Sequence, residues 1–231
     1  RNPHTILSGG LGLLIFCLLM FALLTLNRSL LCGDPVALKM KEVERHPGSV
    51  RANIEIAEFY AAIPPSSNEN ANELYAKAYA HFANAVRISP IDTLGLFGLV
   101  KMNLRNSLPL ENSWIPELAR RISTAPFSPA TGNSIQYSTN CYMAQQCNAT
   151  PEIIESLIKA ALENTSVNTQ QRIQLFLVWS AFLYDVKHQA EEAEKYAILA
   201  SNVDPSNLGF QLNIITLMIN IRKPNSALLL I

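Results

Sequence analysis

Glycine, net charge and catalytic signatures are all scarce in this sequence. Only 9 of its 231 residues are glycine, which is unfavourable for a turn-rich β fold and fits helices better. The chain carries 18 basic and 18 acidic residues. It therefore lacks the excess of positive charge that a sequence-independent nucleic-acid binder needs, and we expect no nucleic-acid partner.

No pattern of a catalytic or metal site is visible. The motifs G-x-S-x-G, P-loop and H-E-x-x-H are absent. The histidines are scattered at His4, His46, His81 and His188, and no cysteine spacing resembles a zinc site. We therefore predict no catalytic residue, no metal and no cofactor in this chain, so that it is not an enzyme. The activity of a longer protein that contained it stays open.

One long apolar run is present near the start of the chain. No residue from Thr5 to Leu26 is charged. As a helix this run would be about 33 Å long, enough to cross a hydrocarbon core of about 30 Å. A signal peptide or a buried core helix are the alternatives, but the core is long and no small-residue cleavage site follows. The sequence predicts a transmembrane helix, with the lipid bilayer as a partner.

The ends of the sequence suggest a piece of a longer protein. Residue 1 is Arg rather than Met, and the last residues, Ala227 to Ile231, are apolar and uncapped. A processed or tagged chain is the alternative. The charges that flank the apolar run are Arg1 before it and Arg28, Lys39 and Lys41 after it. They leave the orientation in a membrane poorly determined.

The rest of the chain reads as consecutive helices. Asp34-Pro35 is typical of a helix start, and His46-Pro47-Gly48 of a stop before the helix that ends near Ala62. Asp92, Ser128, Thr150 and Ser206 are candidate caps. No alternating strand pattern competes. Further helices are predicted over Asn70–Ile88, Asp92–Arg105, Ser113–Ser123, Ser128–Gln145, Thr150–Glu163, Asn168–Val186, Gln189–Asn202 and Ser206–Ile221.

These helices carry a repeat with a period of about 34 residues. Gln174–Pro205 places large, small and proline residues, without a gap, where the tetratricopeptide pattern has them: Leu177, Ala181, Tyr184, Ala193, Ala197, Ala200 and Pro205. The pattern over Pro47–Pro90 also fits if an insertion is placed at Pro64–Asn72. Thr93–Thr169 fits poorly. An all-α tetratricopeptide-like superhelix is predicted, with a generic bundle of α-hairpins as the alternative.

The predicted organisation has five parts. Residues 1–28 are the transmembrane helix and 29–48 a linker helix. Residues 49–106 are a tetratricopeptide-like repeat with a loop insertion. Residues 107–168 are degenerate helical repeats, and 169–231 are tetratricopeptide repeats that are cut at the C-terminus.

The junction after the apolar run carries a resemblance. Leu26–Pro35, followed by Glu44–Asn53, resembles the junction in bacterial polytopic membrane proteins, where a last transmembrane helix leads into a tetratricopeptide domain. The membrane halves of those proteins resemble C-type glycosyltransferases that use lipid-linked sugars. Cys32 departs from the aromatic residue expected there. The catalytic loop of such enzymes would lie in a membrane half outside this sequence, so no catalytic residue transfers to this chain.

Two cysteines form a candidate disulfide. Cys141 and Cys147 would point to different sides of a continuous helix, so they can bond only if the helix ends near Gln146. Two free thiols are the alternative. A disulfide implies an oxidising compartment such as the periplasm. Cys17, within the apolar run, is expected to be an apolar filler.

A concave groove is the candidate binding site. Repeat geometry predicts that eight residues face it: Arg51, Ile54, Glu58, Phe97, Lys101, Val178, Phe182 and Asp185. Such a mixed surface suits a protein or peptide partner. The predicted function is a protein-interaction domain at the bacterial inner membrane, on the periplasmic side, as the non-catalytic part of an envelope glycosyltransferase-like protein. A stand-alone bitopic scaffold for envelope assembly is the alternative.

Overall fold

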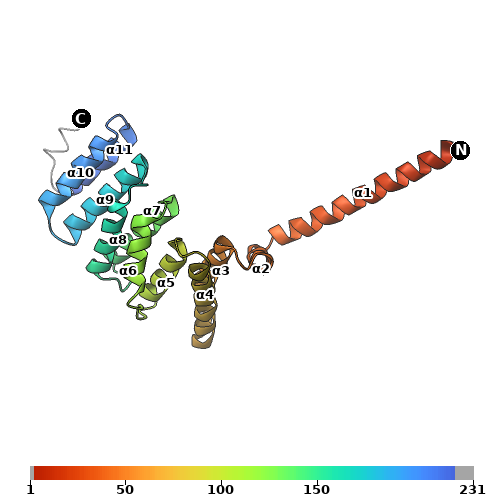
Figure 1. Cartoon of the computed structure of the whole chain (residues 1–231), viewed down its shortest axis with the longest axis horizontal. Coiled ribbons are helices and arrows are strands. Elements are labelled where there is room, and N and C mark those ends of the chain that lie inside the picture. The colour runs from red at the N-terminus through yellow and green to blue at the C-terminus, as the bar shows by residue number, and fades with distance from the viewer. Residues whose placement is uncertain (1–2, 222–231) are drawn as a thin grey trace.

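The fold is all-α over the part of the chain that is described. In the computed structural model these are residues 3–221, with the side chains of residues 12, 14–29 and 33–221. This part contains eleven helices and no strand (Figure 1). They are α1 (Pro3–Cys32), α2 (Pro35–Arg45), α3 (Val50–Ala62), α4 (Asn68–Ile88), α5 (Leu94–Arg105), α6 (Trp114–Thr124), α7 (Pro129–Met143), α8 (Pro151–Glu163), α9 (Thr169–Asp185), α10 (Ala190–Val203) and α11 (Leu208–Asn220).

Short polar side chains start many of these helices. Asp34 Oδ1 accepts hydrogen bonds from the amides of Val36 and Ala37 at 3.0 and 3.1 Å, as its position before Pro35 predicts. Ser49, Ser67 and Ser128 each accept a bond from the amide three residues later. These bonds satisfy amides that a helix leaves unpaired at its first turn.

Three predicted starts differ in detail. Helix α5 begins at Leu94, although Asp92 Oδ1 still accepts a bond from the Leu94 amide at 2.9 Å. The side chain of Thr150 makes no capping bond to α8. The cap of α11 is Asn207 rather than Ser206. The segment predicted to continue beyond Ile221, including Ala227, lies outside the described residues.

The helices after α2 pack as successive antiparallel hairpins in two layers. The pairs are α3 with α4, α5 with α6, α7 with α8, and α9 with α10. Each first helix also contacts the next first helix, so α3, α5, α7, α9 and α11 form one continuous layer. This arrangement exposes one long face of first helices, the face on which helical-repeat proteins bind their partners.

The α9–α10 hairpin has the close packing that its small residues predict. Ala193, Ala197 and Ala200 of α10 are completely buried. Ser180 of α9 donates a hydrogen bond of 2.6 Å to the carbonyl of Ala193. Without side chains larger than methyl on this face, the two helix backbones approach closely, as the pattern over Gln174–Pro205 requires.

The insertion predicted at Pro64–Asn72 is not a long loop. Helix α4 begins at Asn68 and has 21 residues, so only the first part of the insertion is irregular. Ser67 caps the helix, and Asn70 Oδ1 accepts a bond from the Ser66 amide at 3.2 Å. The helix was predicted to begin at Asn70, and it begins two residues earlier because Ser67 caps it.

The N-terminal helix α1 extends away from the repeats (Figure 1). It contacts α2, and its side chains from Leu14 to Ser29 are exposed. Among the described residues, no helix combines enough length with enough apolar character to cross a membrane, so the transmembrane helix over Thr5–Leu26 is not confirmed. The side chains of the first part of that run lie outside the described set. The helix also ends later than predicted, at Cys32.

Candidate binding cleft

A cleft of about 660 Å³ lies across the first-helix layer. Its walls are the C-terminal half of α3 with the turn after it, one side of α5, and α7. The caps at Ser49, Asp92 and Ser128 set where these three helices begin, and so which side chains reach the cleft. We call it the α3–α5–α7 cleft.

The floor of this cleft is apolar. Phe82 of α4, with Phe97 and Met102 of α5, line it and are 2–5% exposed. Gly98 lets the Phe82 ring approach the α5 backbone, because a Cβ at that position would overlap the ring. On the α3 side, the lip is formed by the exposed Pro64 and Pro65.

Charged and amide side chains stand around that floor. Glu58 lies on α3, Lys101 and Arg105 on α5, and Asn133 on α7. The Lys101 ammonium lies 4.2 Å from the centre of the Tyr137 ring of α7, a cation–π contact that joins two walls. In the described part of the chain, neither cation of the cleft nor Glu58 takes part in an ion pair.

The predicted groove residues are only partly brought together. Glu58, Phe97 and Lys101 all line the α3–α5–α7 cleft. Ile54 and Phe182 are 8% and 0% exposed, belong to the core and do not line the cleft.

The remaining three predicted groove residues lie elsewhere. Arg51 is exposed and bonds Glu55 at 2.6 Å. Val178 lines a crevice of about 10 Å³ between α7 and α9, room for one water at most. Asp185 is exposed at the end of α9, away from the cleft.

The wall on α7 was missed by sequence reasoning. Asn133, Ser134, Tyr137 and Ser138 line the cleft. They lie in the region with the poorest repeat match, so repeat positions could not identify them. The signal that was available is the helix predicted from Ser128, in which Asn133 with Tyr137 and Ser134 with Ser138 are each four residues apart and therefore share one face.

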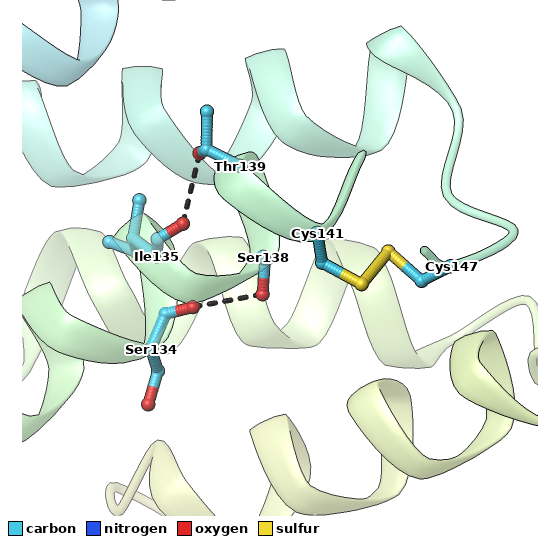
Figure 2. Close-up of a disulfide and its surroundings, with 6 residues drawn as sticks. All are labelled: Ser134, Ile135, Ser138, Thr139, Cys141 and Cys147. Carbon is cyan, nitrogen blue, oxygen red and sulfur yellow. Dashed lines mark hydrogen bonds between the residues drawn. A yellow bond between two sulfur atoms is a disulfide. The ribbon is translucent and has the colours of Figure 1, made fainter. Parts of the chain in front are cut away.

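The two predicted disulfide partners meet at the end of α7. The structure joins Cys141 to Cys147, with Cα atoms 5.6 Å apart (Figure 2). Helix α7 ends at Met143, and Gln145 has a left-handed backbone that turns the chain back. Cys17 is a free, exposed cysteine.

The motif behind the family resemblance has a structural role. Asn53 is 1% exposed and donates hydrogen bonds to the carbonyls of Pro47 and Ser49 at 3.0 and 2.8 Å. Its Oδ1 accepts from Asn84 at 3.0 Å and lies 3.1 Å from His81 Nδ1. Burial lowers the pKa of His81, which favours the neutral ring that donates to Asn53. These bonds fasten the turn before α3 to α4.

A second polar cluster joins α6 to the α4–α5 turn. Arg121, whose side chain is 6% exposed, bonds Glu117 Oε1 at 2.7 Å and donates to the carbonyls of Ser89 and Asp92 at 3.2 and 2.8 Å. Hydrogen bonds from Arg120 and then Arg121 lower the pKa of Glu117 to about 2. The cluster keeps α5, the middle wall of the cleft, against α6. No group of three or more metal-ligating side chains occurs among the described residues.

The fold and the cleft define an all-α protein of repeated helical hairpins with a cleft on its first-helix face. No protein-family model and no curated protein sequence matches the chain. Among solved structures, it is similar to the crystal structure of YrrB, a TPR protein with an unusual peptide-binding site. The identity is 14% over 83% of this chain and 88% of the other, with a TM-score of 0.36. That likeness is too distant to transfer any property of YrrB.

Proposed function

We propose that this chain is a protein-interaction domain that binds a polypeptide segment in the α3–α5–α7 cleft. The observation that supports this most directly is a cleft of about 660 Å³ with a buried aromatic floor and an exposed polar rim. Apolar pockets with a few convergent polar groups are the usual form of a ligand site. Phe97 and Met102 would contact an apolar side chain of the segment, and the amides of Asn106 and Asn133 its peptide groups.

The charges of the rim favour a segment that carries a carboxylate. Lys101 and Arg105 are four residues apart on α5 and lie on the same side of the cleft. Among the described residues that line it, Glu58 is the only acidic one. An anionic side chain bound between the two cations would gain charge-assisted hydrogen bonds. The Tyr137 ring holds the Lys101 ammonium in place for this contact.

The test uses a fluorescein-labelled pool of acetylated dodecapeptides with glutamate fixed at one central position. The full chain, in detergent, is expected to enrich a subset of this pool. Lys101→Glu should weaken that binding by about tenfold, the loss expected for a charge-assisted hydrogen bond.

The matched control is Lys159→Glu, which also removes an ammonium near an aromatic ring, Trp179, but on α8 and outside the cleft lining. It should leave binding unchanged. Equal loss in both variants, or no enrichment by the unaltered chain, would overturn the proposed site.

We also propose the cellular context that the junction implies. The repeats would lie in the periplasm, attached to the bacterial inner membrane through Thr5–Leu26, as the non-catalytic part of an envelope glycosyltransferase-like protein. The support is the uncharged run and the exposure of apolar α1 side chains such as Phe16, Leu19 and Phe21, which are 60–68% exposed. Exposed apolar surface of this extent needs an apolar environment.

Alkaline extraction of membranes that carry the chain tests the attachment. Leu19→Glu with Phe21→Glu should release the chain from the membrane, whereas Leu208→Glu with Leu212→Glu, at exposed positions of α11, should not. Equal release of both variants would contradict anchoring by α1.

The mass of the native polypeptide distinguishes the transferase context from the bitopic scaffold. A species at least twice the 25.5 kDa of this chain supports the transferase context. A species close to that mass supports the bitopic scaffold.

A further inference from the structure

Of the three helices that form the cleft walls, α7 has the sequence least favourable to a helix. Its residues include Gly132, Asn133, Ser134, Ser138 and Thr139, all of which have low helix propensity. The hydroxyls of Ser134, Ser138 and Thr139 each donate at 2.9 Å to a carbonyl one turn back, a bond that competes with helical structure. Figure 2 shows two of these bonds beside the disulfide.

The C-terminal end of α7 is fastened covalently to the loop that follows it. Cys141 lies in the last turn of the helix and Cys147 in the loop. The amide of Gln146 donates to the Cys141 carbonyl at 2.9 Å. The amide of Asn148 donates to the carbonyl of Leu104, in the last turn of α5, at 3.0 Å. The disulfide therefore links α7, through a short loop, to the neighbouring wall of the cleft.

The binding surface depends on the distance between these two walls. Lys101 of α5 and Tyr137 of α7 contact each other across the cleft, and Tyr137 lies one helical turn before Cys141. If the last turns of α7 unwind, the ring leaves the ammonium and the polar face of α7 is no longer fixed. The wall of low helix propensity is thus the one that carries the covalent bond.

We propose that the Cys141–Cys147 disulfide is a redox latch on the α3–α5–α7 cleft. It keeps the cleft competent for binding when oxidised, and reduction lowers affinity. This inference rests on the proposed peptide-binding function. Cys141 is buried and Cys147 half-buried, so a thiolate attacks Cys147 and releases the Cys141 thiolate. The second thiol of a dithiol reductant then frees Cys147. The dithiol becomes a disulfide, and each cysteine takes one proton.

The test combines amide exchange and peptide binding on the full chain in detergent. It compares the oxidised chain, the chain treated with dithiothreitol, and Cys141→Ser with Cys147→Ser. Cys17→Ser is the control, since that thiol is exposed on α1 and far from the cleft in the sequence. Reduction and the double substitution should each accelerate exchange of α7 amides on the order of tenfold, with α9 unchanged. They should also weaken binding of the glutamate-centred dodecapeptide pool by a similar factor.

Each outcome decides the latch. Faster exchange in α7 together with weaker binding supports it. Unchanged exchange in α7, or faster exchange with unchanged binding, overturns it. Acceleration of α7 and α9 alike also overturns it, because the bond would then stabilise the whole domain rather than one wall. If the oxidised chain binds no peptide, the proposed function fails. The exchange data then still show whether the disulfide holds α7.

Discussion

At the scale of single residues, the Arg121 side chain is buried whereas that of its neighbour Arg120 is exposed. Arg121 and Arg120 both bond Glu117, but their side chains are 6% and 56% exposed. Only Arg121 also bonds the carbonyls of Ser89 and Asp92, at the turn that leads into α5. Removing it leaves the carbonyls of Ser89 and Asp92 without this donor, whereas Glu117 keeps its two hydrogen bonds from Arg120.

We therefore expect Arg121→Ala to lower the free energy of unfolding by about 2–4 kcal/mol. Arg120→Ala should change it by about 0.5 kcal/mol or less, because exposed ion pairs contribute little. Urea denaturation of the two variants, followed by circular dichroism in the same detergent, measures the difference. Equal effects would show that the buried bonds of Arg121 do not fasten α6 to the α4–α5 turn.

The carboxyl of Glu117 makes stability depend on pH. Hydrogen bonds from Arg120 and Arg121 lower its pKa from 4.5 to about 2 in the folded chain. A group whose pKa falls on folding contributes stability above its unfolded pKa and loses it as pH falls through the folded value. The chain should therefore lose this contribution between about pH 4.5 and pH 2. Glu117→Gln should flatten that part of the stability profile, and an unchanged profile would contradict the assignment.

The sequence indicates many residues of the core but fewer of the site. Ala193, Ala197 and Ala200 were predicted from repeat positions and are buried. Small residues on one helix face indicate close packing against a neighbouring helix. Phe182 was placed in the groove by the same positions, yet it is completely buried because α7 and α10 both pack against α9. A repeat pattern gives the direction of a side chain but not how closely the next helix covers it.

At the scale of elements, two glycines in the first-helix layer have opposite roles. A Cβ at Gly98 of α5 would overlap the Phe82 ring, whereas a Cβ at Gly132 of α7 would lie 3.5 Å from Phe127, an ordinary contact. Gly98→Ala should thus destabilise the chain by about 1–3 kcal/mol, through the packing of α4 on α5. Gly132→Ala should stabilise it by up to about 1 kcal/mol, because alanine favours a helix.

Thermal unfolding of both glycine variants measures whether the two substitutions change stability in opposite directions. If Gly98→Ala is neutral, the Phe82 ring can move away, and the floor of the cleft is less fixed than its burial suggests.

The two glycines also show what the sequence alone could not predict. Both glycines lie inside predicted helices, and only the packing of α4 against α5 tells them apart.

At the scale of the whole molecule, the buried apolar side chains of the described hairpins form two clusters rather than one core. The larger cluster runs from α3 to α10, with Ile221 after α11, and includes Leu118 and Phe182. The smaller one joins α9, α10 and α11 and consists of Ile173, Ala197, Ala200, Ile214 and Met218. Repeat arrays of this kind transmit stability mainly between neighbouring hairpins. The sequence predicted the chain of hairpins, but not where one cluster ends and the next begins.

Two core truncations should therefore act over different parts of the chain. Met218→Ala and Leu118→Ala each remove a completely buried side chain, at a cost of about 2–5 kcal/mol. Met218→Ala should accelerate amide exchange in α11 and the end of α10, and leave α3–α6 unchanged. Leu118→Ala should accelerate exchange in α6 and α8, which pack on each other, and less in α11. If both variants instead accelerate exchange uniformly along the chain, the hairpins unfold as one cooperative unit. In that case a latch at the end of α7 could not act on the cleft alone.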